Sequence, residues 1–504
     1  MAQMEEAPFA ERRAGILLHP TSLPGRGACG ELGAEAFYFV DFLAGAGIRV
    51  WQMLPLGPTH ADGSPYQCTS VHAGNPQLIN LQRLTDWGWL EPDEAPGDAT
   101  PACDDPLRRA ERLRAAYQGF QANATEYDQA QYADFLHEHS AWLDDFALYA
   151  ALRAEQDNRA WSEWPQPLRD REPAAIAAAR RRLATVIEEI AFAQFLFFKQ
   201  WHALRDYANG CGVLLFGDVP IFVAYDSADV WAHRDAFRLD ADGQMEVVAG
   251  VPPDYFSATG QRWGNPHYRW DRIEQDGFRW WIERMRTQRE LFDLIRIDHF
   301  RGFESHWEIA ASAETAVDGH WVKAPGERLF EALRTNLHGL PLVAEDLGII
   351  TPEVTALRHR FGLPGMAVLQ FAFDHHADNP HKPENVQPDT VYYTGTHDND
   401  TTLGWWRALP GHARQQVMQT LGVDDPDAVP DAMIDTVLRS RAALAILPLQ
   451  DVLQLGSEAR MNTPGTGNGN WTWRFQWDAV PADLASRLLE KNQKAHRCET
   501  LPHP

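Results

Sequence analysis

The sequence is poor in cysteine and contains no long hydrophobic run. Its five cysteines are scattered and form no CxxC pair, which is typical of a protein from a reducing compartment rather than of a disulfide framework. No stretch of about 18 apolar residues occurs, so we expect no membrane-spanning helix. The N-terminal residues MAQMEEAPFAERR have no apolar core and are not typical of a signal peptide. These features predict a cytoplasmic protein.

Positive charge is scarce relative to negative charge. The chain has 45 Lys and Arg residues against 70 Asp and Glu residues, which gives a formal net charge of −25. Nucleic acids and anionic membranes are bound through clustered cations, so we expect neither as a partner. A neutral polysaccharide meets no such penalty. Aromatic residues are abundant, and their rings fill cores or offer flat platforms to sugars. Only rings in loops rich in Gly and Pro are candidates for sugar contact.

Apolar runs alternate with helix-like stretches along the chain. Eight runs are typical of buried parallel strands: Gly15–Leu23, Ile48–Leu56, Val213–Val223, Leu294–Arg301, Leu340–Leu347, Met366–Phe373, Thr390–Asp398 and Leu444–Leu453. Helices are expected between them, for example over Ala34–Ala46, Arg269–Leu291 and Thr351–Phe361. This pattern predicts an α/β fold, a (β/α)8 TIM barrel with large helical insertions between barrel strands.

The spacing of the predicted strands is uneven. About 150 residues separate the second strand from the third, which is too long for a loop. We therefore expect one catalytic domain over residues 1–504, with an insertion subdomain at 57–200 and a smaller insertion at 302–335. Residues 174–201 are expected to form a long helix, broken at most once, and residues 91–106 an acidic turn or linker.

The strand ending in LIRIDHFRGF carries the first candidate acid. Alternation along a strand puts Arg296 and Asp298 on one face and Ile295 and Ile297 on the other. A neighbouring guanidinium favours an ionised carboxylate, so Asp298 is expected to be charged, as a glycosidic nucleophile must be. The alternative is an ion pair that only braces the barrel.

Two further strand ends carry acids. Glu345 follows five apolar residues in LPLVAEDLG, and an apolar setting lets a carboxyl group keep the proton that a general acid needs. Its neighbour Asp346 points the other way and is expected to cap a turn. In VYYTGTHDNDT, His397 and Asp398 are candidates to hold sugar hydroxyl groups, although Asp398 could instead cap the next helix. Retention requires two carboxyl groups about 5–5.5 Å apart, and neighbouring strands lie about 4.8 Å apart, so Asp298 and Glu345 fit this chemistry.

These motifs resemble those of a known family. RIDHFRGF, AEDLG and YTGTHDNDT, in this order, are similar to the α-amylase clan of barrels. Six further segments resemble the amylomaltase, or 4-α-glucanotransferase, branch of that clan: LLHPTSLPG, WQMLPLGPT with DGSPYQ, AGNP, GDVPIFVAYDSADVWAH, GVPPDYFSATGQRWGNPHY and SEARMNTPGTGNGNWTWR. The resemblance spans nearly the whole chain. It implies transfer of an α-1,4-glucan segment, with retention, to the 4-OH of glucose or a maltooligosaccharide through a covalent glucosyl-Asp298 intermediate.

The resemblance also implies roles for single residues. Asp298 matches the nucleophile, Glu345 the general acid/base and Asp398 the stabiliser of the transition state. The positions that match substrate contacts are Ser64, Tyr66, Asp218, Tyr255, Phe256, Trp263, Arg296, Phe371, His397 and Asn470. The stretch HKPENV at 381–386 departs from the family pattern, because Glu384 stands where a His is expected. Position 384 is therefore a doubtful sugar contact.

Transfer requires that water be kept from the intermediate. The segment 250–268 contains glycines, prolines and Trp263, and it is expected to fold over the cleft as a loop; the alternative is an ordinary packed connection. No cofactor and no metal ion are expected. His375, His376 and His381 lack the spacing of a zinc motif and are interpreted as solvated loop residues. An α-glucan hydrolase and an inactive glucan-binding protein remain as competing hypotheses, and the oligomeric state, monomer or dimer, stays open.

Overall fold

The computed structural model describes residues 9, 11–25, 27, 29–92, 106–253, 257–337 and 339–498. An eight-stranded parallel sheet with the strand order β10-β11-β12-β1-β2-β3-β6-β9 forms its centre. The strands are β1 (Arg13–Leu17), β2 (Val50–Gln52), β3 (Leu214–Pro220), β6 (Leu294–Asp298), β9 (Leu342–Ala344), β10 (Gly365–Val368), β11 (Thr390–Tyr393) and β12 (Leu444–Pro448). The two end strands meet, because the N–H of Ala344 in β9 donates to the carbonyl of Pro364 before β10 at 2.8 Å. The predicted (β/α)8 barrel is confirmed.

Side chains that alternate along the strands separate two hydrophobic cores. Leu294 packs inside the barrel with Phe216 and Val343 from the neighbouring strands. Ile295 and Ile297 point outward and pack in the larger core between the sheet and the helices. The same alternation turns Arg296 and Asp298 inward, as the sequence predicted. Each barrel strand overlaps its predicted run but is shorter than it, and β1 and β10 begin two residues and one residue before their runs. The C-terminal parts of the runs form the loops above the barrel.

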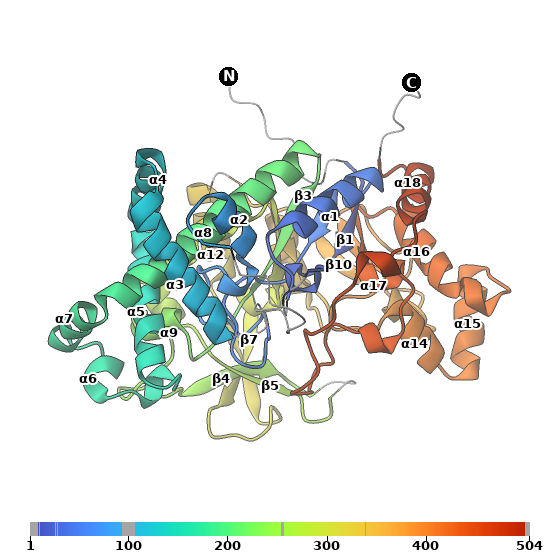
Figure 1. Cartoon of the computed structure of the whole chain (residues 1–504). Helices are drawn as coiled ribbons and strands as arrows, with labels where there is room; N and C mark the ends of the chain where they lie inside the picture. Colours follow the sequence, from blue (N-terminus) through green and yellow to red (C-terminus); the bar gives the residue numbers. More distant parts are fainter. Residues whose placement is uncertain are drawn as a thin grey trace.

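Helices surround the barrel and fill the long connections. They are α1 (Ala34–Gly45), α2 (Leu81–Asp86), α3 (Pro106–Asn123), α4 (Glu126–Glu138), α5 (Ser140–Glu155), α6 (Gln166–Arg169), α7 (Pro173–Arg182), α8 (Ala184–Gly210), α9 (Ala228–Ala232), α10 (Trp270–Gln275), α11 (Arg279–Leu291), α12 (Gly326–Leu337), α13 (Pro352–Arg360), α14 (Thr402–Ala408), α15 (Gly411–Leu421), α16 (Val429–Arg439), α17 (Leu449–Val452) and α18 (Leu484–Lys494). Helices α3 to α7 lie on one flank and α14 to α16 on the other (Figure 1).

Two predicted helices are interrupted. The helix expected over Arg269–Leu291 is two helices, α10 and α11, because Gly277 and Phe278 take left-handed conformations with φ of 75° and 61°. A residue in that region cannot continue a right-handed helix. The long helix expected near 174–201 is broken once, at Leu183, which separates α7 from α8.

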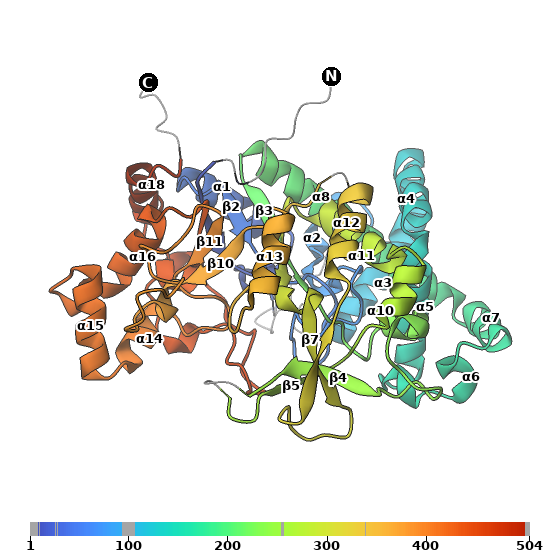
Figure 2. The same cartoon turned by 180° about the vertical axis from the view of Figure 1, so that it is seen from behind.

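A second, antiparallel sheet was missed from the sequence. Its strand order is β5-β4-β7-β8, formed by β4 (Val247–Val251), β5 (Gln261–Pro266), β7 (Ser305–Ala310) and β8 (Gly319–Lys323). Within the segment expected to be a loop over the cleft, Gly250 and Val251 belong to β4 and Gln261–Pro266 form β5, and these two strands pair as an antiparallel hairpin. This sheet lies at one end of the barrel, between the two helical flanks (Figure 2). β7, β8 and most of α12 occupy the region 302–335, which was expected to be a small insertion.

Two chemical features of the fold bear on the sequence analysis. Within the described residues, no helix is both long and apolar enough to span a membrane. Cys68, Cys211 and Cys498 are free thiols, the Cys29 thiol donates to the carbonyl of Gln77 at 3.6 Å, and Cys103 lies outside the described residues.

Candidate active site

A cleft of about 690 Å³ lies at the carboxyl ends of the barrel strands, beside the second sheet. Asp298 is the last residue of β6, Glu345 directly follows β9, and His397 and Asp398 lie in the loop after β11. All four line the cleft. This is the end at which parallel barrels place their reactive residues, because the strand-to-helix loops are free to vary there.

Arg296 connects two carboxylates in the cleft floor. Its Nη1 donates to Asp218 Oδ2 at 2.6 Å, and its Nη2 donates to Asp298 Oδ1 at 2.7 Å. The parallel pairing of β3 with β6 puts Asp218 directly opposite Arg296. Only 5% of Arg296 and 1% of Asp218 are exposed, so the two charges are held with little solvent screening. The guanidinium fixes the position of Asp298 and supports its negative charge.

Glu345 is held by two backbone N–H groups. His299 N donates to Glu345 Oε2 at 2.7 Å, and Leu347 N donates to Oε1 at 2.8 Å. His299 takes a left-handed conformation, with φ of 53°, as the chain leaves β6. Burial raises the pKa of Glu345 to about 7, and the negative charge of Asp298 contributes to the rise. The register pairs Ile297 with Ala344, so Asp298 and Glu345 follow as the next neighbours across the two strands.

Tyr66 and His397 form one wall of the same pocket. The Tyr66 hydroxyl donates to Asp218 Oδ2 at 2.7 Å, and its ring stacks on the His397 imidazole with the ring centroids 5.1 Å apart. Burial raises the pKa of Tyr66 well above its usual value, and the charge of Asp218 adds to this effect. The hydroxyl therefore stays protonated and serves as a donor.

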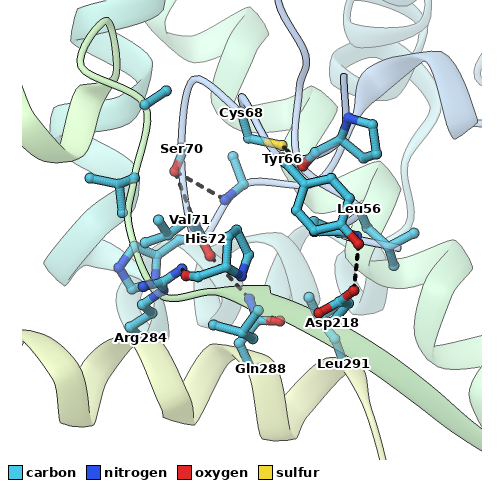
Figure 3. A pocket seen from close by; sticks show the side chains of 18 of the residues that line it. Leu56, Tyr66, Cys68, Ser70, Val71, His72, Asp218, Arg284, Gln288 and Leu291 are labelled. Atoms are coloured by element: carbon cyan, nitrogen blue, oxygen red, sulfur yellow. Dashed lines mark hydrogen bonds between the residues drawn. The ribbon is translucent and has the colours of Figure 1, made fainter. Parts of the chain in front are cut away.

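Behind this wall lies a small cavity. Figure 3 shows Tyr66 and Asp218 joined by their hydrogen bond at one side of it, with Gln288 and Leu291 of helix α11 below. Its volume is only about 40 Å³, far below the 300 Å³ or more of a typical ligand site. Burial raises the pKa of Cys68, which also lines it, to about 12, so this thiol is neutral. The cavity supports the back of the site and is too small for a sugar.

Asp398 is placed differently from the other acids. Its side chain is 50% exposed, and it is held by Asn462, whose Nδ2 donates to Asp398 Oδ1 at 2.7 Å. His397 Nε2 lies 3.3 Å from the same oxygen. Arg460 Nη2 donates to the backbone carbonyl of Asp398 at 2.5 Å. The position of Asp398 thus depends on the segment around residues 460–462.

The other predicted substrate contacts are distributed around the cleft. Ser64, Trp263, Phe371 and Asn470 all line it. The Trp263 ring meets the His299 ring edge to face, with centroids 4.8 Å apart. Asn470 braces its own turn, because its Oδ1 accepts from Thr463 N at 2.9 Å. Asp218 supports the site from beneath through Arg296 and Tyr66.

Several expectations fall outside the site. Tyr255 and Phe256 lie outside the described residues. Glu384 is exposed and does not line the cleft. Asp346 was expected to cap a turn. Instead its Oδ1 accepts a hydrogen bond from Met366 N at 2.7 Å, which connects the end of β9 to β10. Asp346 also pairs with Arg358.

The cleft residues that sequence reasoning missed include Asn462, Trp471 and Trp321. Trp471 lies 6.0 Å from His397 and 6.1 Å from Tyr66 between ring centroids. Its place in the Gly-rich stretch GTGNGNW satisfied the criterion for a sugar-facing ring and could have identified it. Trp321 lies on β8, a strand that the sequence analysis did not predict.

One possible metal-ligand group occurs among the described residues, formed by His267, His306 and Glu308, whose ligand atoms lie within 4.8 Å of one another. The two imidazoles are stacked, with centroids 4.4 Å apart, so their in-plane lone pairs do not converge on one point. Arg238 Nη1 already donates to both Glu308 oxygens, at 2.8 and 2.9 Å. A cation would have to displace this guanidinium, so the arrangement fits a packed polar group better than a metal centre.

The chain is similar to known proteins over most of its length. A family model described as 4-alpha-glucanotransferase matches residues 18–480. The 4-alpha-glucanotransferases of Thermus thermophilus and Synechocystis are 51% and 47% identical to this chain; the alignments cover 96% and 95% of this chain and 99% and 96% of theirs. The amylomaltase of Streptococcus agalactiae, solved in complex with acarbose, superposes with a TM-score of 0.92 at 36% identity, covering 97% of this chain and 100% of that one. The chain therefore belongs to the 4-alpha-glucanotransferase family, glycosyl-transferring enzymes that act on α-1,4-glucans.

Proposed function

We propose that this enzyme transfers an α-1,4-glucan segment by a retaining double displacement through a covalent glucosyl-Asp298 intermediate. The observation that carries the proposal is the different surroundings of two acids on neighbouring strands. Arg296 donates to Asp298 at 2.7 Å, whereas burial raises the pKa of Glu345 to about 7. One carboxylate is ready to attack, and the other retains a proton to donate.

In the first step, Glu345 donates its proton to the glycosidic oxygen as Asp298 attacks the anomeric carbon. The bond from that carbon to the leaving glucan breaks, and an ester bond to Asp298 forms. In the second step, Glu345, now ionised, accepts the proton from the 4-OH of the acceptor. The acceptor oxygen displaces Asp298, and two inversions give overall retention.

The residues around the two acids hold the sugar at the point of cleavage. Asp398 and His397 are placed to bind its hydroxyl groups 2 and 3, contacts that strengthen as the ring flattens in the transition state. The Tyr66 hydroxyl and Arg296 both donate to Asp218, and Arg296 also holds Asp298 in position for attack. Donors and acceptors in this proposal are α-1,4-glucans and maltooligosaccharides, with glucose as a further acceptor.

The experiment that tests this function uses maltotriose as the sole substrate. Transfer predicts maltooligosaccharides longer than maltotriose together with glucose. Glucose and maltose without any longer product would identify a hydrolase and contradict the proposal. Parallel measurement of the product anomer by NMR tests retention, since an inverted anomer would exclude the Asp298 intermediate.

A further inference from the structure

The cleft continues beyond Glu345 along a surface that the proposed chemical steps do not use. This surface, the outer arm, consists of Arg301, Trp321, Leu347, Gly348 and Ile349, all of which line the same cleft. Two of its members are large apolar side chains left open to solvent, since 40% of Trp321 and 63% of Ile349 is exposed. Apolar surface that is left exposed inside a binding cleft is typical of a ligand contact.

Trp321 is built into the second sheet rather than carried on a loop. It lies on β8, directly opposite Trp307 on β7, and the two rings meet at 65° with centroids 5.2 Å apart. Trp307 is itself fixed, because its Nε1 donates to the carbonyl of Ala316 at 3.0 Å. The underlying ring thus holds the Trp321 indole in place.

Arg301 is a second contact that holds Trp321. Its guanidinium carbon lies 3.8 Å from the centroid of the Trp321 ring, within the range of a cation–π contact. Its Nη1 donates to the carbonyl of Ile349 at 2.6 Å, and the residue is only 7% exposed. The outer arm is therefore ordered before any ligand arrives, so binding there requires little loss of side-chain freedom.

The position of the acid shows which part of a glucan would meet this arm. A general acid protonates the oxygen that leaves with the departing glucan, so the departing part must lie on the Glu345 side of the cleaved bond. Leu347, which holds Glu345 through its N–H, continues into Gly348 and Ile349 of the arm. The acceptor enters where the departing glucan has left, and it meets the same surface.

We propose that Trp321, together with Ile349, binds the second and following glucose units of the departing or acceptor glucan. The indole would lie against the apolar C–H face of a glucose ring, while Arg301 holds the indole in position. This inference rests on the proposed transfer reaction and assigns acceptor-length preference to a residue on the second sheet. Glucose, a single unit beside the cleaved bond, would not reach the arm.

The test measures acceptor KM with α-maltosyl fluoride as donor, because fluoride leaves the outer arm empty during the first step. For Trp321→Ala we expect the KM for maltotriose as acceptor to rise roughly three- to tenfold, as loss of an aromatic contact does, with the KM for glucose changed less than about twofold. For Trp321→Phe we expect a KM for maltotriose between that of the parent enzyme and that of Trp321→Ala. Tyr127→Ala, which removes an aromatic residue that is 70% exposed on α4, is the matched control and should change neither constant.

Equal effects on both acceptors, or no effect on either, would overturn this inference. Ile349→Ala protects the test against misfolding of the Trp321 variants, since that side chain is mostly exposed and its loss should also raise the KM for maltotriose alone. If the parent enzyme released only maltose from the fluoride with both acceptors, the transfer reaction itself would be contradicted, and the failure would be visible without any variant.

Discussion

The floor and the rim of the cleft are built on different principles. In the floor, Asp218, Arg296 and Asp298 lie on paired strands, and a parallel ladder sets their spacing. On the rim, Asp398 lies in a loop and depends on Asn462, a residue 64 positions away in the chain. The Arg296 side chain is 6% exposed, whereas the Asp398 side chain is 50% exposed. In the proposed mechanism, the nucleophile is thus placed by a barrel strand, whereas the acid that orients the sugar is placed by a loop.

The largest effect is expected from removing the charge of Asp298 in the floor of the cleft. Asp298→Asn is expected to lower kcat by about 10⁴-fold or more, because an amide cannot form the ester intermediate. Steady-state transfer from maltotriose measures the loss. Asp242→Asn, at a side chain that is 78% exposed, is the control and should keep full activity. An Asp298→Asn enzyme as active as the parent would remove Asp298 from the mechanism.

Glu345→Gln is expected to lower kcat/KM by about 10² to 10⁴-fold, the usual contribution of general acid catalysis. In the parent enzyme, kcat/KM should fall as pH rises above about 7, because Glu345 has to be protonated for the first step. A pH profile of kcat/KM for the parent and for Glu111→Gln, an exposed glutamate of α3, provides the measurement and its control. A parent profile without an alkaline decline near pH 7 would contradict the assignment.

The same raised pKa predicts a stability effect with a definite sign. Between the usual pKa of 4.5 and the folded-state value of about 7, the folded protein binds more protons at Glu345 than the unfolded chain does. The free energy of unfolding therefore falls as pH rises through this window. Glu345→Gln removes this loss, so it should stabilise the protein at pH 8 by at most on the order of 3 kcal/mol, and hardly at pH 4. Denaturant unfolding of the parent enzyme and of Glu345→Gln at pH 8 and at pH 4 tests this prediction.

A substitution on the rim should lower activity less than one in the floor. Asn462→Ala removes one hydrogen bond to the Asp398 carboxylate, so we expect kcat/KM to fall roughly tenfold without loss of folding. Asn336→Ala, at an exposed position on α12, serves as the control. A loss as large as that of Asp298→Asn would show that the floor and the rim do not differ in the way described.

The smallest effect is expected at the hairpin. Trp263 lines the cleft beside His299, and its removal should admit water to the intermediate. For Trp263→Ala we predict that the ratio of hydrolysis products to products longer than maltotriose rises roughly a few-fold. Chromatography of the products gives the ratio. An unchanged product distribution would mean that the hairpin does not govern access of water.

The sequence predicted the floor residues and also Asp398 on the rim, but it did not predict what holds Asp398 in place. The floor was predictable because apolar runs locate parallel strands, and period-two alternation decides which side chains point inward. Asn462 could not be paired with Asp398 in this way, since nothing in a loop sequence records which distant segment it meets. The second sheet was missed for a related reason: β8 is largely exposed, and β5 contains Gly264 and Pro266, residues that favour a loop.

The identity of the nucleophile can be read directly by trapping the intermediate. In Glu345→Gln, α-maltosyl fluoride can still react, because fluoride needs no proton, while the second step lacks its base and slows. Peptide mass spectrometry of the quenched enzyme should then find one maltosyl group on Asp298. A maltosyl group on another carboxylate, or turnover of the fluoride with no labelled peptide, would contradict the double displacement through Asp298.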